Sequence, residues 1–463
     1  MKSVECFICY LNDNYLWGPP MLVLLLGTHL FLTIRLRGIQ RYIPLAIKLS
    51  FGRSKEGEGD VSQFGALMTA LAATIGTGNI IGVAAAVAAG GPGAVFWCWL
   101  TGVLGIATKY SEALLAVKFR VHTSDGHMLG GPMYALERGL KMKWAGVLFA
   151  VFTAIAAFGI GNIVQANALA QRAHSAFGAP YWVSGIVMTV LTAIVILGGI
   201  KSIANVCSAL VPFMAIFYIV GSLIILATGA SQIPHTLALI FKSAFTGQAA
   251  VGGFLGATIM IAARWGVARG LFSNESGLGS APIVAAAAQT KNPVRQALVS
   301  STGTFWDTVV VCAITGLVLV NTGVWKMHFD GGAGALTEAA FGTVHSLGPI
   351  VLTIALATFV FSTILGWSYY GEKALEYLVG RKAILPYRII WVGLVMFGSV
   401  STPTLVWGFA DAANALMALP NLLSLLLLSG VVVAETRKYL WEGDLDEVAP
   451  VSIEQKEKDV LMK

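Results

Sequence analysis

The sequence predicts an all-α protein that crosses a membrane about eleven times, with two discontinuous helices in a five-plus-five inverted repeat and one extra N-terminal helix. Three observations predict this fold. First, 56% of the 463 residues are hydrophobic and only 11% are charged, whereas a soluble domain carries roughly 25% charged residues. Second, apolar segments recur at the length of a membrane span. Third, two of those segments are interrupted at their centres by Gly, Ser, Thr and Asn.

Eleven apolar segments are long enough to cross a bilayer, given roughly 20 residues for each helix. They lie near residues 17–36, 62–90, 94–117, 145–170, 180–200, 204–228, 251–290, 296–320, 349–378, 387–402 and 404–434. These spans divide the chain into four predicted parts. They are an N-terminal extra helix with its loop (1–61), a first repeat of five helices (62–230), a second repeat of five helices (231–434) and a cytoplasmic tail (435–463).

The second predicted span is interrupted near its middle. Residues 76–82 read Gly-Thr-Gly-Asn-Ile-Ile-Gly, within a stretch from Val61 to Thr108 that contains no charged residue. Non-helical backbone at membrane depth is tolerated only where it is buried in protein or lines a cavity. An unwound helix that offers bare amides and carbonyls to a solute is typical of a secondary transporter.

The seventh predicted span, 251–290, is too long and too polar at its centre for one simple helix. Residues 270–282 read Gly-Leu-Phe-Ser-Asn-Glu-Ser-Gly-Leu-Gly-Ser-Ala-Pro, with apolar sequence on both sides. One interpretation is a cytoplasmic loop between two short spans. Because such a loop would invert every later loop, the favoured interpretation is one long discontinuous helix.

The two interrupted spans occupy corresponding places in the chain. The first begins near residue 62 and is predicted to run from inside to outside. The second begins near residue 251, five spans later, and is predicted to run from outside to inside. Two discontinuous helices at matching positions of oppositely oriented halves indicate an inverted repeat.

Lys and Arg residues orient the spans, because cytoplasmic loops carry an excess of both. Most lie where the eleven-span topology places cytoplasm: Arg35, Arg37, Arg41, Lys48, Arg53, Lys55, Lys118, Arg120, Arg138, Lys141, Lys143, Lys201, Lys291, Arg295, Lys373, Arg381, Lys382, Arg388, Arg437, Lys438, Lys456, Lys458 and Lys463. On the opposite side lie only Lys2, Arg172, Lys242 and Lys326. The asymmetry predicts an N-terminus outside and a C-terminus in the cytoplasm. It also accounts for the net charge of +7 without a nucleic-acid partner.

Three motifs carry a family resemblance. They are Gly-Thr-Gly-Asn-Ile-Ile-Gly (76–82), Gly-Gly-Pro-Gly-Ala-Val-Phe-Trp-Cys-Trp-Leu (90–100) and the polar motif at 270–282. Together they resemble the alanine or glycine:cation symporters, sodium-driven amino-acid carriers of prokaryotes, although Cys98 stands where that family has Met. The resemblance implies a leucine-transporter-type fold, Na⁺-coupled uptake of alanine and often glycine, and a place in the prokaryotic cell membrane.

The resemblance implies a sodium ion held between the first and eighth helices of the repeat. Its ligands would be the adjacent hydroxyls of Ser362 and Thr363 and the carbonyl oxygens of Ala72 and Ile75. Na⁺ is a hard cation, which neutral oxygens bind without the cost of a buried carboxylate. Alternatively, both hydroxyls only hydrogen-bond to carbonyls of their own helix, as Ser and Thr often do.

The carboxylate of the substrate is expected at the N–H groups of Thr77 and Gly78, at the positive end of the following half-helix. Asn79 serves either the substrate or a second cation. Acceptors for the substrate ammonium are expected in the second unwound segment, at Ser273, Asn274, Ser276 and Gly277.

Two further side chains are predicted to line the substrate pocket. Trp367 lies one helical turn after Thr363 and is expected to limit the size of the substrate. The alternative is a Trp that packs between helices. Gln165 shares a helix face with Asn162, and it either reaches the substrate or hydrogen-bonds to another helix.

Ionisable residues within the predicted spans are functional hypotheses, with mutual pairing as the alternative. They are Lys109, Glu112, Arg264, Arg269, Glu275, Asp307 and Asp411. Lys109 and Glu112 are three residues apart and are predicted to pair. Arg269 and Glu275 are a second candidate pair. Asp307 lies near the midplane and, with Thr74, is a candidate for a second cation site or a proton-titrating group.

The sequence thus predicts a secondary active transporter and not an enzyme, with a small neutral amino acid, Na⁺ and membrane lipid as its partners. Coupling to H⁺ through Glu275 or Asp307 is an alternative within the same class. A membrane-embedded hydrolase is the alternative from another class. Against it, the seven His residues are scattered, and neither a Ser-His-acid triad within one span nor a His-Glu-x-x-His motif occurs. The choice among alanine, glycine and serine, and the oligomeric state, stay open.

Overall fold

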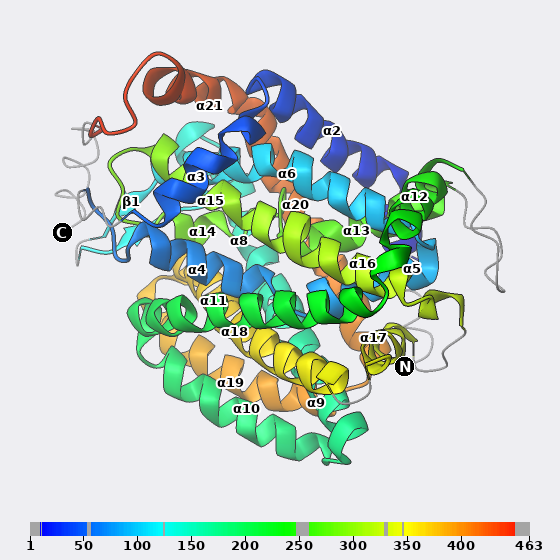
Figure 1. The fold of residues 1–463 in the computed structure, drawn as a ribbon. Coiled ribbons are helices and arrows are strands. Elements are labelled where there is room, and N and C mark those ends of the chain that lie inside the picture. Colours follow the sequence, from blue (N-terminus) through cyan, green and yellow to red (C-terminus); the bar gives the residue numbers. More distant parts are fainter. Residues whose placement is uncertain are drawn as a thin grey trace.

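The computed structural model describes residues 10, 12–52, 57–123, 126–246, 259–327, 332–344 and 347–449, and these are mostly helical (Figure 1). The α-helices are α2 (Pro19–Arg35), α3 (Ile43–Ser50), α4 (Gln63–Thr74), α5 (Val83–Gly90), α6 (Gly93–Lys118), α7 (Pro132–Tyr134), α8 (Lys143–Ala156), α9 (Val164–Phe177), α10 (Tyr181–Ile196), α11 (Gly199–Thr228), α12 (Ile233–Phe245), α13 (Ile259–Asn274), α14 (Pro282–Ala285), α15 (Pro293–Thr304), α16 (Ala313–Asn321), α17 (Gly332–Gly342), α18 (Leu347–Val379), α19 (Ile384–Val400), α20 (Pro403–Leu427) and α21 (Ser429–Thr436).

Shorter elements join or extend these helices. The π-helical turns are η1 (Asn12–Leu16), η3 (Gly78–Gly82), η4 (Ala135–Gly139), η5 (Ala157–Ile163), η7 (Phe305–Cys312) and η10 (Arg437–Trp441). The 3₁₀ turns are η2 (Ile39–Tyr42), η6 (Ala230–Gln232), η8 (Val324–Lys326) and η9 (Arg381–Ala383). Two short strands, β1 (Val121–His122) and β2 (Met128–Leu129), pair antiparallel.

Each apolar segment that the sequence predicts to span the membrane contains helix at the predicted place. Polar side chains cap the first turns of two of these helices. The side chain of Ser62 accepts the N–H of Gly65 at 3.0 Å before α4. The side chain of Asn292 accepts the N–H of Arg295 at 2.9 Å before α15. These caps satisfy N–H groups that a helix terminus leaves without an intrahelical partner.

The predicted number of eleven spans is not confirmed. By length and composition, the described residues contain seven continuous helices able to cross a membrane, or up to nine if each of two bent pairs is one span. One bent pair is Pro19–Arg35 with Ile39–Ser50 (67°), and the other is Gln63–Thr74 with Gly78–Gly90 (50°). The seventh predicted span is divided between α13 and α14, and its part before residue 259 lies outside the described residues.

Both interrupted spans are discontinuous helices, and they lie side by side. The first consists of α4, η3 and α5, and the second of α13 and α14. α13 packs against α5 and η3, whereas α14 packs against α4. The first half of each discontinuous helix therefore contacts the second half of the other, so the two run antiparallel and their breaks meet near the centre of the bundle.

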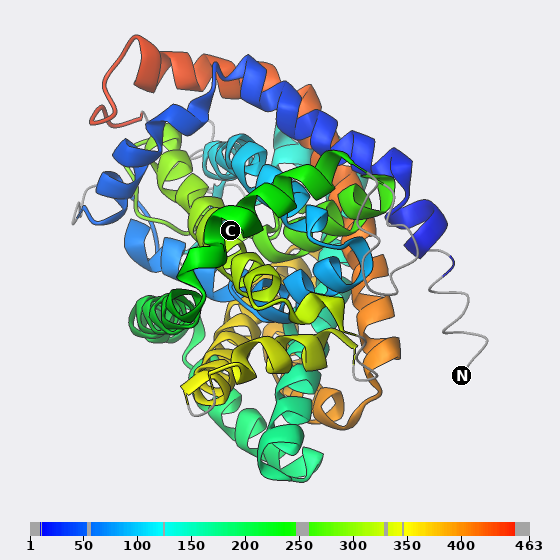
Figure 2. The ribbon, with the colours of Figure 1, turned by 45° about the vertical axis from the view of Figure 1, so that its right-hand side comes forward.

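The helices form a bundle around this antiparallel pair. Figures 1 and 2 both show α2 on one side of the bundle and α10 on the opposite side. α6 packs against α2, α13 and α15, and α18 packs against α4, α8 and α11. Close approach depends on small residues. A Cβ on Gly266 of α13, for example, would lie 2.7 Å from Trp97 Cβ of α6.

The outer helices expose large apolar side chains, as a membrane protein must. On α10 the exposed residues include Ile186, Val190 and Ile194, and on α19 they include Ile389 and Phe397. A contiguous apolar surface of this kind is unfavourable in water and favourable against lipid. Trp367, Trp391 and Tyr370, by contrast, are fully buried.

The two ends of the bundle differ. One end carries α3, β1 and α14 and is called the β1 end, at the left of Figure 1. The other carries α5, α12 and α17 and is called the α17 end, at the right of Figure 1. The sequence predicts loops where α3, α12 and α17 lie, so those three helices are additions to the predicted fold.

Candidate functional site at the meeting of the two breaks

The first break is held by its own residues and by one amide from α9. α4 ends where Ile75 turns to an extended conformation (ψ 93°). The N–H of Gly76 then donates to Asn79 Oδ1 at 2.8 Å, and the N–H of Thr77 donates to Gln165 Oε1 at 3.2 Å. The hydroxyl of Thr77 is buried without a hydrogen-bond partner among the described residues.

Two glycines allow other helices to reach this break. A Cβ on Gly76 would lie 2.5 Å from Thr363 Oγ1, and a Cβ on Gly78 would lie 3.1 Å from Ser273 Cα. Larger residues would therefore push α18 or α13 away from the break. Glycine permits the close backbone approach that a ligand site between these helices needs.

A buried carboxylate joins the first break to the second discontinuous helix. Asn79 Nδ2 donates to Asp307 Oδ1 at 2.7 Å, and the Ser273 hydroxyl donates to Asp307 Oδ2 at 2.9 Å. The Thr308 hydroxyl donates to the same Oδ2 at 2.6 Å. Cys312 Sγ lies 3.4 Å from Asn79 Nδ2 and 3.2 Å from the Ser273 hydroxyl. Asp307 thus accepts hydrogen bonds from residues of three elements.

α18 presents one of its two adjacent hydroxyls to the break. The Thr363 hydroxyl donates to the carbonyl oxygen of Ile75 at 3.2 Å. The Ser362 hydroxyl instead donates to Phe359 O of its own helix at 2.9 Å and lies 3.4 Å from Met214 Sδ of α11. The structure therefore brings Thr363 to the break and turns the Ser362 hydroxyl towards α11.

The other predicted cation ligands lie on α4 beside α18. A Cβ on Gly366 would lie 2.8 Å from Ala73 N, so the two helices are close together there. Ala72 is buried in the same turn as Ala73. The Thr74 hydroxyl donates to Leu71 O of its own helix at 3.3 Å.

The predicted pocket side chains Gln165 and Trp367 both lie against η5. Gln165 Nε2 donates to Ile160 O at 2.9 Å, while its Oε1 faces the first break. Trp367 is fully buried and meets Tyr370 edge-on, with ring centroids 5.4 Å apart. Gly161 leaves the space that this indole occupies, because a Cβ there would overlap the Trp367 side chain.

The second break carries residues that face away from the first. The Ser276 hydroxyl hydrogen-bonds to Thr304 Oγ1 of α15 at 3.1 Å, and the N–H of Gly277 donates to Glu112 Oε1 of α6 at 3.0 Å. Asn274 Oδ1 accepts the N–H of Ser276 at 2.9 Å. Asn274 Nδ2 is buried without a hydrogen-bond partner among the described residues. Of the four acceptors predicted here, Ser273 is the one bonded to the cluster at the first break.

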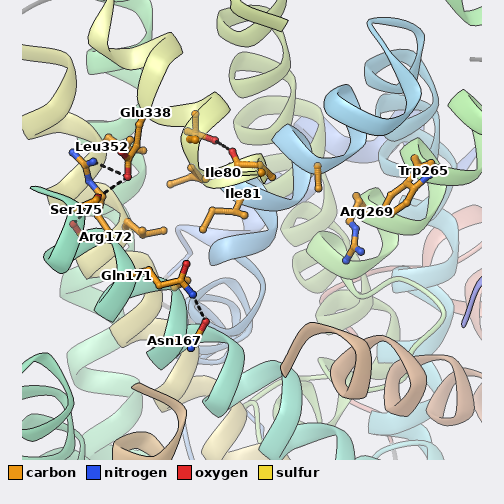
Figure 3. A pocket seen from close by; sticks show the side chains of 18 residues that line it. Ile80, Ile81, Asn167, Gln171, Arg172, Ser175, Trp265, Arg269, Glu338 and Leu352 are labelled. Atoms are coloured by element: carbon orange, nitrogen blue, oxygen red, sulfur yellow. Dashed lines mark hydrogen bonds and ion pairs between the residues drawn. The ribbon is translucent and has the colours of Figure 1, made fainter. Parts of the chain in front are cut away.

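A cavity of about 480 Å³ leads from the α17 end towards the first break (Figure 3). Ile80, the residue after Asn79, lines it. Figure 3 shows Arg172 and Glu338 on one side and Arg269 on the other, with Ile80 between them. Arg172 NH1 lies 2.9 Å from Glu338 Oε1. The cavity is thus bordered by buried guanidinium groups held by carboxylates.

The hydrogen bonds of the buried ionisable residues differ from the predicted pairs. Arg269 binds Asp411 through two hydrogen bonds of 3.0 and 2.9 Å. Glu275 Oε2 accepts the hydroxyl of Ser280 at 2.6 Å. Lys109 Nζ has no hydrogen-bond partner in the part of the chain that the structure describes. The predicted pairing of Lys109 with Glu112 is therefore not formed as a hydrogen-bonded ion pair: Glu112 Oε1 accepts neutral donors, and Glu112 Oε2 has no hydrogen-bond partner among the described residues.

Sequence reasoning missed Gly161, Cys312 and Asn421. Asn421 Nδ2 donates to Glu112 Oε1 at 2.6 Å and to Gly277 O at 2.9 Å. A signal for it existed, since an amide beside Pro420 in a largely apolar helix needs a buried partner. Gly161 and Cys312 carry no comparable signal, because small apolar residues are common throughout these helices.

The polar groups around the first break are of the types that bind a hard cation and a zwitterionic ligand. Around the first break lie hydroxyls, side-chain amides, backbone N–H and C=O groups and one carboxylate, and hard cations prefer oxygen ligands of these types. Among the described residues, no group of three or more His, Cys, Asp or Glu side chains is placed to hold a metal ion.

The chain is similar in sequence to known proteins over nearly its whole length. The family model described as the sodium:alanine symporter family matches residues 1–451. The sodium/alanine symporter AgcS of Methanococcus maripaludis is 53% identical over 94% of this chain and 97% of its own. An uncharacterised transporter of Haemophilus influenzae is 52% identical over 92% of this chain and 94% of its own.

A solved structure shares the fold. The crystal structure of MhsT in complex with L-phenylalanine covers 83% of this chain and 94% of its own, with a TM-score of 0.60 and 16% sequence identity. At that identity the likeness shows the fold alone, which is that of a leucine-transporter-type carrier.

Proposed function

Since the chain belongs to the sodium:alanine symporter family, we propose that this polytopic membrane protein couples the uptake of alanine, and of glycine, to an inward flow of Na⁺. The family and its relatives are cation-coupled amino-acid symporters and not enzymes, which excludes the membrane-embedded hydrolase. The choice of Na⁺ and of alanine rests on the chemistry of the site.

The observation that carries the proposal is the contact between the Thr77 N–H and the Gln165 side-chain carbonyl at 3.2 Å. The amide oxygen occupies the position that an oxygen of a substrate carboxylate would take at the start of the half-helix. A carboxylate there replaces Gln165 Oε1 and gains the partial positive charge of the helix terminus. Gly78 and Asn79 extend the same binding surface.

The ammonium group of the substrate requires acceptors on the opposite wall. α13 ends beside Gly78 with Ser273 and Asn274, and their carbonyl and side-chain oxygens are the proposed acceptors. Ser276 and Gly277 belong to the same proposed set, although their hydrogen-bond partners lie on α15 and α6. Trp367 is proposed to close the pocket around a short side chain.

Na⁺ is proposed to bind between α4 and α18. Thr363 Oγ1 and the carbonyl oxygen of Ile75 are 3.2 Å apart, so rotation of the Thr363 O–H away from Ile75 would leave both oxygens free to bind one cation. Ser362 and Ala72 complete the proposed ligand set. For Ser362 this requires rotation of a hydroxyl that now donates to Phe359 O.

Asp307 is proposed as a ligand for a second cation, together with Asn79, which donates to it, and Thr74 of α4. Its carboxylate accepts three donors, from Asn79, Ser273 and Thr308. A cation at this carboxylate would keep a buried negative charge paired. The alternative is that Asp307 binds a proton. Uptake measured under a Na⁺ gradient and under an H⁺ gradient distinguishes the two alternatives.

Substrate is proposed to enter through the 480 Å³ cavity at the α17 end. The distribution of Lys and Arg assigns that end to the outside and the β1 end to the cytoplasm.

The test is uptake of radiolabelled alanine into proteoliposomes that contain the purified protein. We expect uptake under an inward Na⁺ gradient, little uptake under an H⁺ gradient alone, and competition by glycine. Uptake that follows the H⁺ gradient would replace Na⁺ by H⁺ in the proposal. Uptake of neither alanine nor glycine under either gradient would remove the assigned substrate.

A further inference from the structure

The second break follows a backbone path that an ordinary residue avoids. Three of the five residues from 275 to 279 have positive φ, namely Glu275 (57°), Gly277 (91°) and Gly279 (83°). A positive φ is costly for a residue with a side chain, and Glu275 has one. This segment, residues 275–281, persists because the surroundings hold it, and it is called the bridge below.

One carboxylate oxygen holds the bridge. Glu112 Oε1 of α6 accepts the N–H of Gly277 at 3.0 Å, the N–H of Gly279 at 3.1 Å and Nδ2 of Asn421 at 2.6 Å. Asn421 also donates to the carbonyl oxygen of Gly277 at 2.9 Å. The Glu112 carboxylate therefore ties the bridge to α6 and, through Asn421, to α20.

The two breaks are supported in different ways. At the first break, Asn79 caps Gly76 from within the same segment, and the neutral amide of Gln165 on α9 accepts the N–H of Thr77. At the second, the support of Gly277 and Gly279 comes from Glu112, more than 150 residues away in the chain. Removing Glu112 would thus leave two buried backbone N–H groups without their acceptor.

The bridge is continuous with the proposed substrate wall. α13 ends with Ser273 and Asn274, and Ser273 donates to Asp307 at the first break. Asn274 Oδ1 accepts the N–H of Ser276 within the bridge. A shift of the bridge would therefore move the acceptors that face Gly78.

We propose that Glu112 is a positioning residue for transport, whose carboxylate fixes the bridge and thereby the α13 wall of the substrate site. The proposal deepens the proposed function and rests on it. Glu112 contacts the bridge and does not contact the substrate, so its effect on affinity is indirect.

The test compares Glu112→Ala with Glu372→Ala as a matched control. Glu372 is a similarly buried carboxylate on α18, bound by Arg388 Nε at 2.6 Å, and among the described residues it has no hydrogen bond to the bridge. We expect Glu112→Ala to raise the KM for alanine in proteoliposomes about 10- to 100-fold. We expect Glu372→Ala to lower stability through loss of its ion pair with Arg388. The KM should stay within about threefold of wild type, because Glu372 does not hold the bridge.

A second readout does not depend on transport. Amide hydrogen exchange of the purified full chain, measured without substrate, should be faster in the peptides that cover the bridge after Glu112→Ala, by about tenfold or more. Glu112→Gln retains an acceptor oxygen, so both effects should be smaller in that variant. If Glu112→Ala gives no folded protein, Asn421→Ala replaces it and should show the same two changes.

Wild-type exchange at the bridge together with a wild-type KM in the folded variant would overturn the proposal. Faster exchange with an unchanged KM would also overturn it, because Glu112 would then support the fold without positioning the site. If the wild-type protein takes up no alanine, the proposed function fails, and the exchange comparison alone decides whether Glu112 holds the bridge.

Discussion

Ser362 and Thr363 are adjacent on α18, yet their hydroxyls lie on different sides of the helix. Consecutive residues of an α-helix are about 100° apart around its axis, so when Thr363 faces Ile75, Ser362 faces Met214. A sequence that shows only a Ser-Thr pair predicts both as ligands. The contact between α18 and α4 is needed to distinguish them.

Replacement of Thr363 should therefore impair cation binding more than replacement of Ser362. Thr363→Val keeps the shape of the side chain and removes the oxygen beside Ile75 O. We expect the half-saturating Na⁺ concentration for alanine uptake to rise roughly 5- to 100-fold, the range for a lost hydrogen bond or charged contact. Ser362→Ala should raise it less. A larger effect at Ser362 would move the proposed ion site towards α11.

Trp367 should set the size of the substrate. Because the indole fills the space left by Gly161, Trp367→Leu should open a pocket that accepts larger side chains such as that of valine. The ratio of alanine to valine uptake should fall about 10- to 200-fold, the usual value of a few methylene contacts. The measurement is competition for uptake by purified, monodisperse protein.

A purely structural role for Trp367 predicts a different result. In that case Trp367→Leu lowers the yield of folded protein and keeps the order of substrate preference. Trp391, which is equally buried against Phe158 and Tyr387, supplies the control. Trp391→Leu should lower stability and leave the preference for alanine over valine as it is.

At the scale of single residues, the site residues that could be predicted from the sequence are polar residues and glycines that interrupt apolar segments. Gly76, Asn79 and Asp307 stand out in apolar segments, and the structure brings them together. Gly161 does not stand out, because its role depends on the Trp367 side chain that lies opposite it. Such partners, distant in the chain, are set by packing and leave no local pattern.

At the scale of elements, the end of the described chain docks on the start of α15. Asn292 Nδ2 donates to Leu445 O at 2.9 Å and to Glu447 O at 3.0 Å. Asp446 Oδ1 lies 3.2 Å from Lys291 Nζ and 2.7 Å from Arg295 NH1. The hydrogen bond from Lys291, with the nearby charge of Arg295, lowers the pKa of Asp446 below its ordinary value of 3.8.

The docking of this segment should be insensitive to pH between 5 and 8. A carboxylate whose pKa is lowered by folding contributes its full stabilisation above the unfolded value and loses it only as the pH falls through the lower, folded value. We expect constant amide exchange of residues 444–449 from pH 5 to 8, after correction for the intrinsic rate. A change centred near pH 6 to 7 would instead implicate a histidine.

Asn292→Ala should release the same segment at every pH, because it removes two hydrogen bonds and the cap of α15. Asp446→Asn should have a smaller effect, since Asp446 is largely exposed and exposed ion pairs contribute little. Exchange of residues 444–449 in the two variants measures the difference. Equal effects would mean that the ion pairs and the amide contribute alike.

Among elements, the long helices were predicted well and the short ones were not. Apolar runs of span length identify helices such as α6, α11 and α18, whereas α12 and α17 lie in stretches that are too short for a span and were predicted as loops. The π-helical turns were also missed. They differ from α-helix in hydrogen bonding and not in composition, so no residue pattern marks them.

At the scale of the whole molecule, orientation in the membrane is the main expectation still to be measured. The two ends of the bundle are expected on opposite sides of the membrane. The distribution of Lys and Arg predicts that the β1 end faces the cytoplasm. Lys48 is exposed at the β1 end and Ala176 is exposed at the α17 end. Both positions therefore suit single-cysteine labelling.

In a background without Cys6, Cys9, Cys98, Cys207 and Cys312, Ala176→Cys should react with a membrane-impermeant maleimide added to intact cells. Lys48→Cys should react only after the membrane is permeabilised. Transport activity of each variant is the control for correct folding. The opposite labelling pattern would reverse the proposed topology and, with it, the direction of substrate entry.

The π-helical turns η3, η5 and η7 have a consequence for how this chain is compared with its relatives. Each accommodates an extra residue in its turn, and each lies beside a proposed site residue: Asn79, Gln165 and Asp307. Loss of one residue from such a turn would rotate the flanking helix by about 100° and take these side chains out of the site. Insertions and deletions of single residues among functional homologues should therefore be confined to other parts of the chain. The positions of gaps in an alignment would then mark the site independently of which amino acids are conserved there.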